Sequence, residues 1–174
     1  MSRKSYGILR VGTLLGEHMP KQTAASIFID SALRGEPITP YRHTQHRPML
    51  FVDIHDACKA LETFATMVLR DDSNLQKTKA TVVNLVWPRP VTIIELARII
   101  KARIRLIDRK REPKISVIDK GIRPLYAPRD KNRIRVDISK ARKILGMDKL
   151  VSPQESIERI LLNRVQLSDG KRND

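Results

Sequence analysis

The sequence predicts an α/β fold, because short apolar runs alternate along the chain with longer amphipathic patterns. The short runs are rich in β-branched residues and are bounded by Gly or Pro, which is typical of buried strands. Hydrophobic residues make up 41% of the 174 residues but aromatic residues only 4%, so we expect an aliphatic core. The predicted strands are few, short and widely spaced, and a sheet this thin indicates part of a larger α/β domain.

The predicted strands are the short apolar stretches of the chain. Their β-branched side chains favour extended backbone, and Pro at the ends of a stretch limits its pairing. We expect strands at residues 8–11, 49–52, 81–87 and 114–119, with residues 36–41 a short strand at most. Residues 71–79, DDSNLQKTK, are polar and are predicted to form a surface loop before the third of these strands.

The helices are predicted from apolar residues that recur every three or four positions. Their ranges are 21–34, 53–70, 92–104, 137–145 and 153–165. Gly35 and Gly146 stand directly after the first and fourth patterns, where glycine commonly ends a helix. Along the second helix we expect a buried face formed by Ala57, Ala60, Leu61, Phe64 and Val68.

Helix starts are marked by side chains that can accept hydrogen bonds from free backbone amides. Thr92 with Glu95, and Ser152 with Glu155, have the spacing of a capping box. Asp137 stands where an N-cap residue is expected, directly before the fourth helical pattern. These signals fix the starts of three helices more firmly than the apolar spacing does.

The chain has a strong and uneven positive charge. Its formal net charge is +15 and its pI about 10.4; residues 98–143 hold 17 of the 34 basic residues and 5 acidic ones, so +12 lies there. For most of these side chains a solvated, Arg-rich surface is the favoured interpretation. A phosphorylated ligand and nucleic acid are the alternatives, although no aromatic residues are interleaved for base stacking.

The chain has the length of one domain, which we assign to residues 1–166, with a polar tail at 167–174. No apolar run approaches the roughly 20 residues that cross a bilayer, and the N-terminus lacks the features of a signal peptide. The single cysteine, Cys58, excludes an internal disulfide and favours a reducing compartment, so we expect a cytoplasmic protein. Cys58 lies in an apolar helical pattern and is predicted to be buried rather than a nucleophile.

The common motifs of cofactor and metal sites are missing from the sequence. The glycines at 7, 12 and 16 do not have the G-x-G-x-x-G spacing, and there is no phosphate-binding G-x-x-x-x-G-K-[ST] loop. His43 and His46 are close together, but no carboxylate or cysteine completes a metal-ligand set. We therefore assign no catalytic, cofactor-binding or metal-binding residue in this chain.

The stretch RHTQHRPMLFVDIHDACKALETF, residues 42–64, puts a polar loop directly before an apolar strand and a helix start. Arg47 lies at the mouth of that strand. Sites that bind phosphate often have such an arginine, whereas a purely structural loop has little need of one. Taken alone, Arg47 is equally consistent with an ordinary surface residue.

Six segments of the chain follow one another in the order and at the spacing of a known protein family. They are LRVGTLLGEHMP, ALRGEPIT, QHRPMLFVDIHDACKALE, NLVWPRPVTIIELARII, RVDISKARKILGM and PQESIERIL. Over residues 6–165 they resemble the C-terminal half of the NAD-dependent epimerase/dehydratase family, extended short-chain dehydrogenases/reductases that act on nucleotide sugars. Arg10 and Gly16 match the family's R-x-x-N-x-x-G stretch. The resemblance implies a partial Rossmann-like sheet edge with a small α/β substrate-binding subdomain, lacking the N-terminal dinucleotide-binding half.

The resemblance also implies a set of substrate-binding residues. An arginine at the position of Arg47 commonly contacts the diphosphate of the nucleotide sugar in this family. Thr13 stands where the family usually has an asparagine that touches the substrate. Ala127 occupies the position of a second phosphate-facing arginine, for which Arg129 or Arg123 is the expected substitute.

The half of the family that binds NAD is not present in this sequence. That half carries the glycine fingerprint and a Tyr-x-x-x-Lys pair, in which the tyrosine is the general acid or base. Lys4 and Tyr6 have the wrong order and spacing for this pair. The resemblance therefore implies that the chain binds a UDP- or dTDP-sugar, is inactive alone and binds no NAD itself. A separate chain supplying the NAD-binding half, or self-association, would complete the site.

Two other functions stay open. The chain could be a non-catalytic basic module that binds nucleic acid or an acidic partner, or a fragment that serves oligomerisation.

Overall fold

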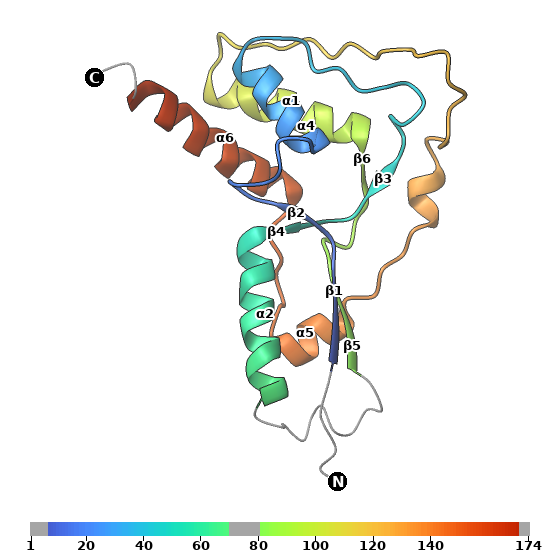
Figure 1. Ribbon diagram of the computed structural model, residues 1–174, viewed down its shortest axis with the longest axis vertical. Coiled ribbons are helices and arrows are strands. Elements are labelled where there is room, and N and C mark those ends of the chain that lie inside the picture. Colours follow the sequence, from blue (N-terminus) through green and yellow to red (C-terminus); the bar gives the residue numbers. More distant parts are fainter. Residues whose placement is uncertain (1–6, 70–80, 171–174) are drawn as a thin grey trace.

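The computed structural model describes residues 7–69 and 81–170 and confirms the α/β class (Figure 1). The strands are β1 (Gly7–Val11), β2 (Thr13–Leu15), β3 (Pro48–Met49), β4 (Phe51–Asp53), β5 (Thr81–Leu85) and β6 (Val91–Thr92). The helices are α1 (Ala24–Leu33), α2 (Ile54–Leu69), α4 (Ile93–Ile107), α5 (Ser139–Leu145) and α6 (Pro153–Gly170), with a short 3-10 helix, η1 (Asp130–Arg133).

The described strands pair two by two. β1 pairs in parallel with β5, β2 in parallel with β4, and β3 antiparallel with β6. Between β1 and β2, the amide of Gly12 donates to the Leu85 carbonyl (3.0 Å). The next amide, that of Thr13, donates to the Leu50 carbonyl (2.7 Å). The chain therefore changes its partner strand at Gly12. A Cβ atom there would lie 2.7 Å from the Leu50 carbonyl oxygen, so this crossing needs glycine.

Two hydrophobic clusters hold these elements together. The first lies among α1, α4 and α6, and the second among β1, β5, α2 and α5, as the upper and lower parts of Figure 1 show. Ile100 and Ile157 are fully buried in the first cluster, and Val83 and Leu85 in the second. Both clusters are mainly aliphatic, as the low aromatic content predicts.

A polar network joins the end of β4 to α6. The buried carboxylate of Asp53 accepts hydrogen bonds from Ser156 Oγ (2.6 Å) and from Arg159 Nη2 (2.6 Å). Arg159 also donates through Nε to Glu17 Oε1 (3.1 Å), which lies after β2. Because Asp53 also accepts from the His55 amide (2.9 Å), one side chain both caps α2 and anchors α6.

The predicted helix signals are largely confirmed. The Thr92–Glu95 and Ser152–Glu155 capping boxes are both formed, and Gly146 ends α5 with a left-handed φ of 63°. The first helix begins later than predicted, because the Thr23 side chain accepts from the Ser26 amide and so fixes the start at Ala24. The predicted loop at 71–79 lies outside the described residues.

Several element predictions are wrong. Residues 114–119 are not a strand: they make only isolated bridges, from Ile115 to Ile38 and from Ile118 to Tyr41. The 49–52 stretch is split at Leu50 into β3 and β4, and β2 and β6 were not expected. The N-cap of α5 is the residue after Asp137, although the Asp137 carboxylate still accepts from the Ser139 amide (2.8 Å).

Two side chains on α2 are more exposed than predicted. Cys58 is exposed, because it lies on the side of α2 opposite to the buried Ala57, Ala60 and Phe64. Leu61 is also exposed instead of joining that face. Among the described residues, no helix is both long and apolar enough to cross a membrane.

Candidate functional site

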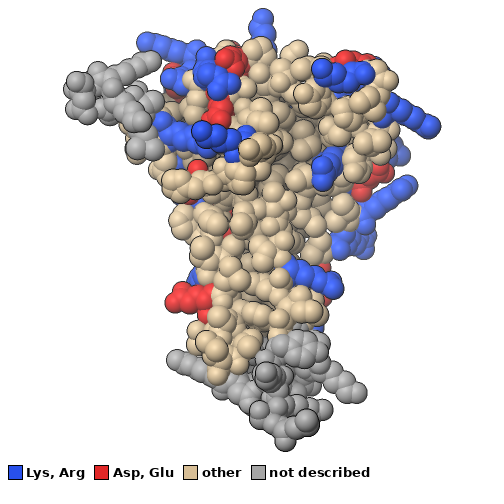
Figure 2. All heavy atoms as spheres, viewed as in Figure 1, with Lys and Arg blue, Asp and Glu red and all other residues tan. Residues whose placement is uncertain are grey.

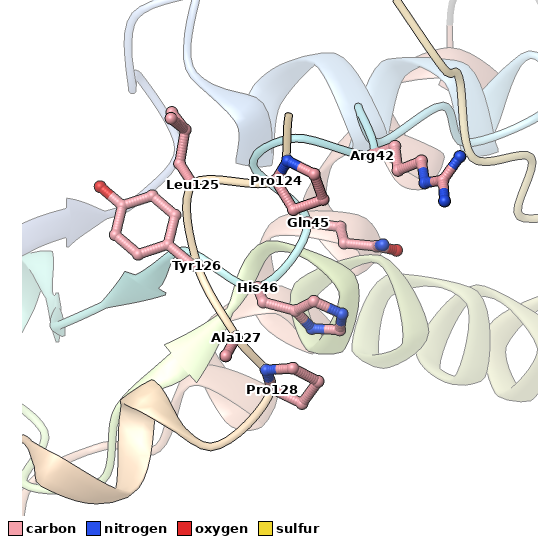
Figure 3. Close-up of a pocket in the computed structure, with 8 residues that line it drawn as sticks. All are labelled: Arg42, Gln45, His46, Pro124, Leu125, Tyr126, Ala127 and Pro128. Atoms are coloured by element: carbon pink, nitrogen blue, oxygen red, sulfur yellow. The ribbon is translucent and has the colours of Figure 1, made fainter. Parts of the chain in front are cut away.

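A cleft of about 390 Å³ opens between the loop at residues 41–47 and the segment at residues 123–129 (Figure 3). In this view Arg42, Gln45 and His46 project to one side, while Leu125 and Tyr126 project to the other. The lining residues are Arg42, Gln45, His46, Pro124, Leu125, Tyr126, Ala127 and Pro128. One wall is thus polar and the other mainly apolar.

The polar wall is held by backbone hydrogen bonds. Within the loop, the Arg47 amide donates to the Thr44 carbonyl (2.8 Å). The carbonyls of Gln45 and Arg47 accept from the first amides of α4, those of Ile94 (2.9 Å) and Ile93 (3.3 Å). The loop therefore sits on the N-terminus of α4, and its side chains face the cleft from a fixed base.

The segment that carries the second wall is tied to the loop at residues 41–47 and to the start of α4. The Leu125 amide donates to the His43 carbonyl (2.9 Å). Before this point, Arg42 pairs with Asp119 (2.5 Å). After it, Lys131 of η1 pairs with Glu95 in the first turn of α4. These three contacts hold the segment from 119 to 131 against the loop and α4.

Two carboxylates near the cleft are kept charged by these pairs. The hydrogen bond from Arg42, with that from the Gly121 amide, lowers the pKa of Asp119. For Glu95, burial acts to raise the pKa, but hydrogen bonds from Lys131 and Thr92 outweigh burial and keep the pKa below its usual value. Both carboxylates are therefore ionised at neutral pH and occupied by their own partners.

Three of the predicted substrate-binding residues adjoin lining residues in the sequence, although they do not line the cleft themselves. Arg47 follows His46, Arg123 precedes Pro124 and Arg129 follows Pro128. The three arginines are exposed, and no described carboxylate forms an ion pair with any of them. Their charges are therefore free of described ion-pair partners.

Thr13, the fourth predicted residue, is exposed at the start of β2 and is not among the residues that line the cleft. Its Cα pairs with that of Phe51 in β4, four positions after Arg47. None of the four predicted residues lines the cleft itself: the three arginines adjoin lining residues in sequence, and Thr13 lies on β2.

Several residues of the polar wall were not predicted from the sequence. Arg42, Gln45 and His46 line the cleft, and in the same loop the Tyr41 and His43 rings stack with their centroids 5.7 Å apart. The polar composition of YRHTQHR was the available signal. A loop so rich in hydrogen-bonding side chains fits a polar surface better than a plain turn.

Side chains cap the N-termini of four of the described helices. The pyrophosphate of a dinucleotide commonly rests on a helix N-terminus with free amides. In α1, α2, α4 and α6, a first-turn amide is already bonded to the side chain of Thr23, Asp53, Thr92 or Ser152. Across residues 7–69 and 81–170, no group of three or more His, Cys, Asp or Glu residues could hold a metal ion.

No protein-family model matches the sequence, and no curated protein matches it significantly. Solved structures do match. The UDP-glucuronic acid 4-epimerase of Bacillus cereus, in complex with UDP-glucuronic acid and NAD, is 20% identical with a TM-score of 0.65, over 92% of this chain and 45% of that one. The epimerase Mth375 of Methanothermobacter thermautotrophicus is 18% identical with a TM-score of 0.64, over 95% and 45%.

A further match is the UDP-glucose 4-epimerase of Thermotoga maritima with UDP-glucose. It is 20% identical with a TM-score of 0.58, over 94% of this chain and 47% of that one. The chain thus spans less than half the length of these structures. At such identities the likeness establishes the fold: nearly the whole chain has the Rossmann-like α/β fold of part of a UDP-sugar 4-epimerase.

Proposed function

We propose that this chain is the substrate-binding portion of an NAD-dependent nucleotide-sugar epimerase or dehydratase. Its ligand is a nucleoside diphosphate sugar of the UDP or dTDP class, whose diphosphate is held at the cleft by Arg47 together with Arg129 or Arg123. The observation that supports the proposal is the set of three exposed arginines, without described carboxylate partners, that adjoin lining residues of one cleft in the sequence. Epimerases of the same fold bind UDP-glucuronic acid and UDP-glucose.

The chemistry of arginine supports a diphosphate as the ligand. Its planar guanidinium can donate two parallel hydrogen bonds to two phosphate oxygens and keeps its charge at any physiological pH. The cleft volume of about 390 Å³ lies near the small end of ligand sites, which run from roughly 300 to 1,000 Å³. A nucleotide sugar would therefore need a further wall, supplied by another part of the fold.

NAD and the catalytic groups belong, in this proposal, to that other part of the fold. The missing glycine fingerprint supports this division. The chain alone would then bind the sugar nucleotide weakly and turn nothing over. Whether the remaining half is continuous with this chain or separate does not alter the chemistry proposed for the cleft.

The surface over β1 is where we propose that the remaining half docks. Parallel sheets are normally covered on both faces and contain more than two strands. β1 and β5 form a parallel pair with α2 and α5 on one side, and Ile8, Val11 and Leu14 are exposed. Figure 2 shows few charged residues along the middle of this face, whereas Lys and Arg gather on the upper part of the molecule.

Isothermal titration of the purified chain with UDP-glucose, UDP-glucuronic acid and NAD tests the proposal. We expect a UDP-sugar to bind and NAD not to bind. Arg47→Ala should weaken UDP-sugar binding by about 10- to 100-fold, since a charge-assisted bidentate contact is worth about 1.5–3 kcal/mol. Arg34→Ala removes the same charge from the exposed end of α1 and serves as the control.

The titration also separates this proposal from the basic-module alternative. If no UDP-sugar binds, and an oligonucleotide binds with a steep dependence on salt, the chain acts as a polyanion-binding module instead. If Arg34→Ala weakens UDP-sugar binding as much as Arg47→Ala, the effect is one of net charge and the assignment of Arg47 fails.

A further inference from the structure

Both walls of the cleft are fastened to the same point, the N-terminus of α4. The first four amides of a helix have no acceptor within the helix. Here the amides of Ile93 and Ile94 are satisfied by the carbonyls of Arg47 (3.3 Å) and Gln45 (2.9 Å). The polar wall is thus attached to α4 through backbone groups, independently of any side chain in the loop.

The opposite wall reaches the same helix end through one ion pair. Lys131 lies in η1, two residues after Arg129, and its Nζ contacts Glu95 Oε1. The other carboxylate oxygen of Glu95 accepts from the Thr92 amide (2.9 Å), and the Glu95 amide donates back to Thr92 Oγ1 (3.3 Å). Glu95 is therefore held by its own capping box and offers Lys131 a fixed partner.

We propose that Glu95 and Lys131 are positioning residues, which hold Arg129 at a set distance from Arg47 so that both arginines can reach one diphosphate. This inference rests on the proposed function for its ligand. Neither Glu95 nor Lys131 touches the ligand; they act through the wall that carries Arg129. Among the ion pairs of the described residues, this one ties η1, which directly follows Arg129, to the first turn of α4.

The need for such a tie follows from the irregular backbone of this wall. Residues 108–129 form no helix and no regular strand. A segment without regular hydrogen bonding that must be ordered by its ligand loses conformational entropy on binding, and this loss weakens affinity. The contacts of Leu125 with His43 and of Lys131 with Glu95 order the segment beforehand.

Two variants remove the tie with little other change. Glu95→Gln keeps the capping box, because glutamine fills the same role as glutamate there, but removes the charge. Lys131→Met removes the partner and keeps the length of the side chain. The matched control is Glu158→Gln, which breaks the pair of Arg103 with Glu158 (3.2 Å) between α4 and α6, away from the cleft.

The first measurement is the affinity of the full 174-residue chain for UDP by titration calorimetry. We expect Glu95→Gln and Lys131→Met each to weaken UDP binding about tenfold, equivalent to about 1.4 kcal/mol, with the double variant no weaker than the worse single one. Glu158→Gln should bind as the native chain does. Thermal melting of all variants separates loss of position from loss of folding.

The second measurement, hydrogen exchange at residues 123–131 without ligand, does not depend on binding. We expect these amides to exchange faster in Lys131→Met and to be unchanged in Glu158→Gln. Unchanged exchange, or unchanged UDP affinity in a chain that binds UDP, overturns the inference. If the native chain binds no UDP while exchange still rises, the proposed function fails and the tie is structural only.

Discussion

Asp53 carries a buried charge because hydrogen-bond donors from two separate segments surround it. The side chain is fully buried, and burial acts to raise its pKa. Hydrogen bonds from Ser156, Arg159 and the His55 amide outweigh burial and keep the pKa below its usual value. The ionised carboxylate is therefore a structural link between β4, α2 and α6, and not a candidate acid.

Replacing Arg159 by methionine should destabilise the protein strongly. Breaking a buried ion pair typically costs about 3–5 kcal/mol, and because Arg159 is partly exposed we expect a loss of about 2–3 kcal/mol. Urea unfolding at pH 7 measures it. Arg103→Met, which breaks the more exposed pair with Glu158, is the control and should lose less than about 1 kcal/mol. If the two variants lose the same free energy of unfolding, the ion pair of Arg159 with Asp53 contributes no more than an exposed pair.

The Asp53 carboxylate should make the free energy of unfolding depend on pH in the acidic range. Because the pKa of folded Asp53 is lower than its usual value of 3.8, ionised Asp53 stabilises the fold above that pH and loses this effect as pH falls through the folded pKa. The difference in unfolding free energy between the native chain and Asp53→Asn should be constant near neutral pH. It should shrink below about pH 4. A difference that stays constant down to about pH 2 would refute the assignment.

Among the elements, the junction of β2 with α2 is packed too closely for any side chain at Gly16. A Cβ atom at this position would lie 2.7 Å from Cβ and from Cγ2 of Ile54. The branch point of Ile54 cannot move away without shifting α2. Gly16→Ala should therefore cost about 1–3 kcal/mol, typical of overpacking, measured as a lower urea midpoint with an unchanged slope.

A glycine elsewhere in the chain, Gly121, serves as a control that separates the effect of crowding from the effect of backbone conformation. A Cβ atom added at Gly121 would meet no other atom within 4 Å, but the φ of Gly121, 68°, is left-handed. Gly121→Ala should therefore lose only the conformational part, about 1 kcal/mol. The replacement Gly16→Ser should be worse than Gly16→Ala if space is the cause. Serine tolerated as well as alanine would argue against crowding.

Among the elements, the starts of helices could be predicted where the capping side chain and the amide that it bonds are close in the sequence. Thr92 with Glu95 and Ser152 with Glu155 depend on three-residue spacing, and both boxes are formed. β2 and β6 were not predictable, because strands of three and two residues have no periodicity to detect. Residues 114–119 have strand composition but find only bridging contacts with Ile38 and Tyr41, since the neighbouring backbone is itself irregular.

The candidate site could be predicted only in part, because some of its contacts join segments that are far apart in the sequence. The position of Arg47 before an apolar strand suggested phosphate binding, which stays a prediction: its neighbour His46 lines the cleft and Arg47 does not. The roles of Glu95 and Lys131 depend on a contact between segments 36 residues apart. A capping box explains Glu95 completely within its own helix, so its second bond had no sequence signal.

At the scale of the whole molecule, positive charge and apolar exposure lie on different parts of the surface. Basic side chains crowd the upper part in Figure 2, where α1, α4 and the cleft wall lie, and are sparse along the face over β1. Exposed Ile8, at 46%, and Leu14, at 43%, belong to consecutive strands on either side of Gly12. A charged patch repels a second copy of the chain, whereas an apolar face attracts one.

The final prediction follows from this separation. The apolar face over β1 should drive weak self-association of the purified chain, which sedimentation velocity would record as an s-value that rises with concentration. Ile8→Asp should remove the association, because burying an unpaired carboxylate in the contact is unfavourable. Leu106→Asp changes a more exposed leucine at the end of α4 and should leave the association intact. A native chain that stays monomeric at millimolar concentration, or an association that both variants abolish equally, would mean that the β1 face is not the docking surface.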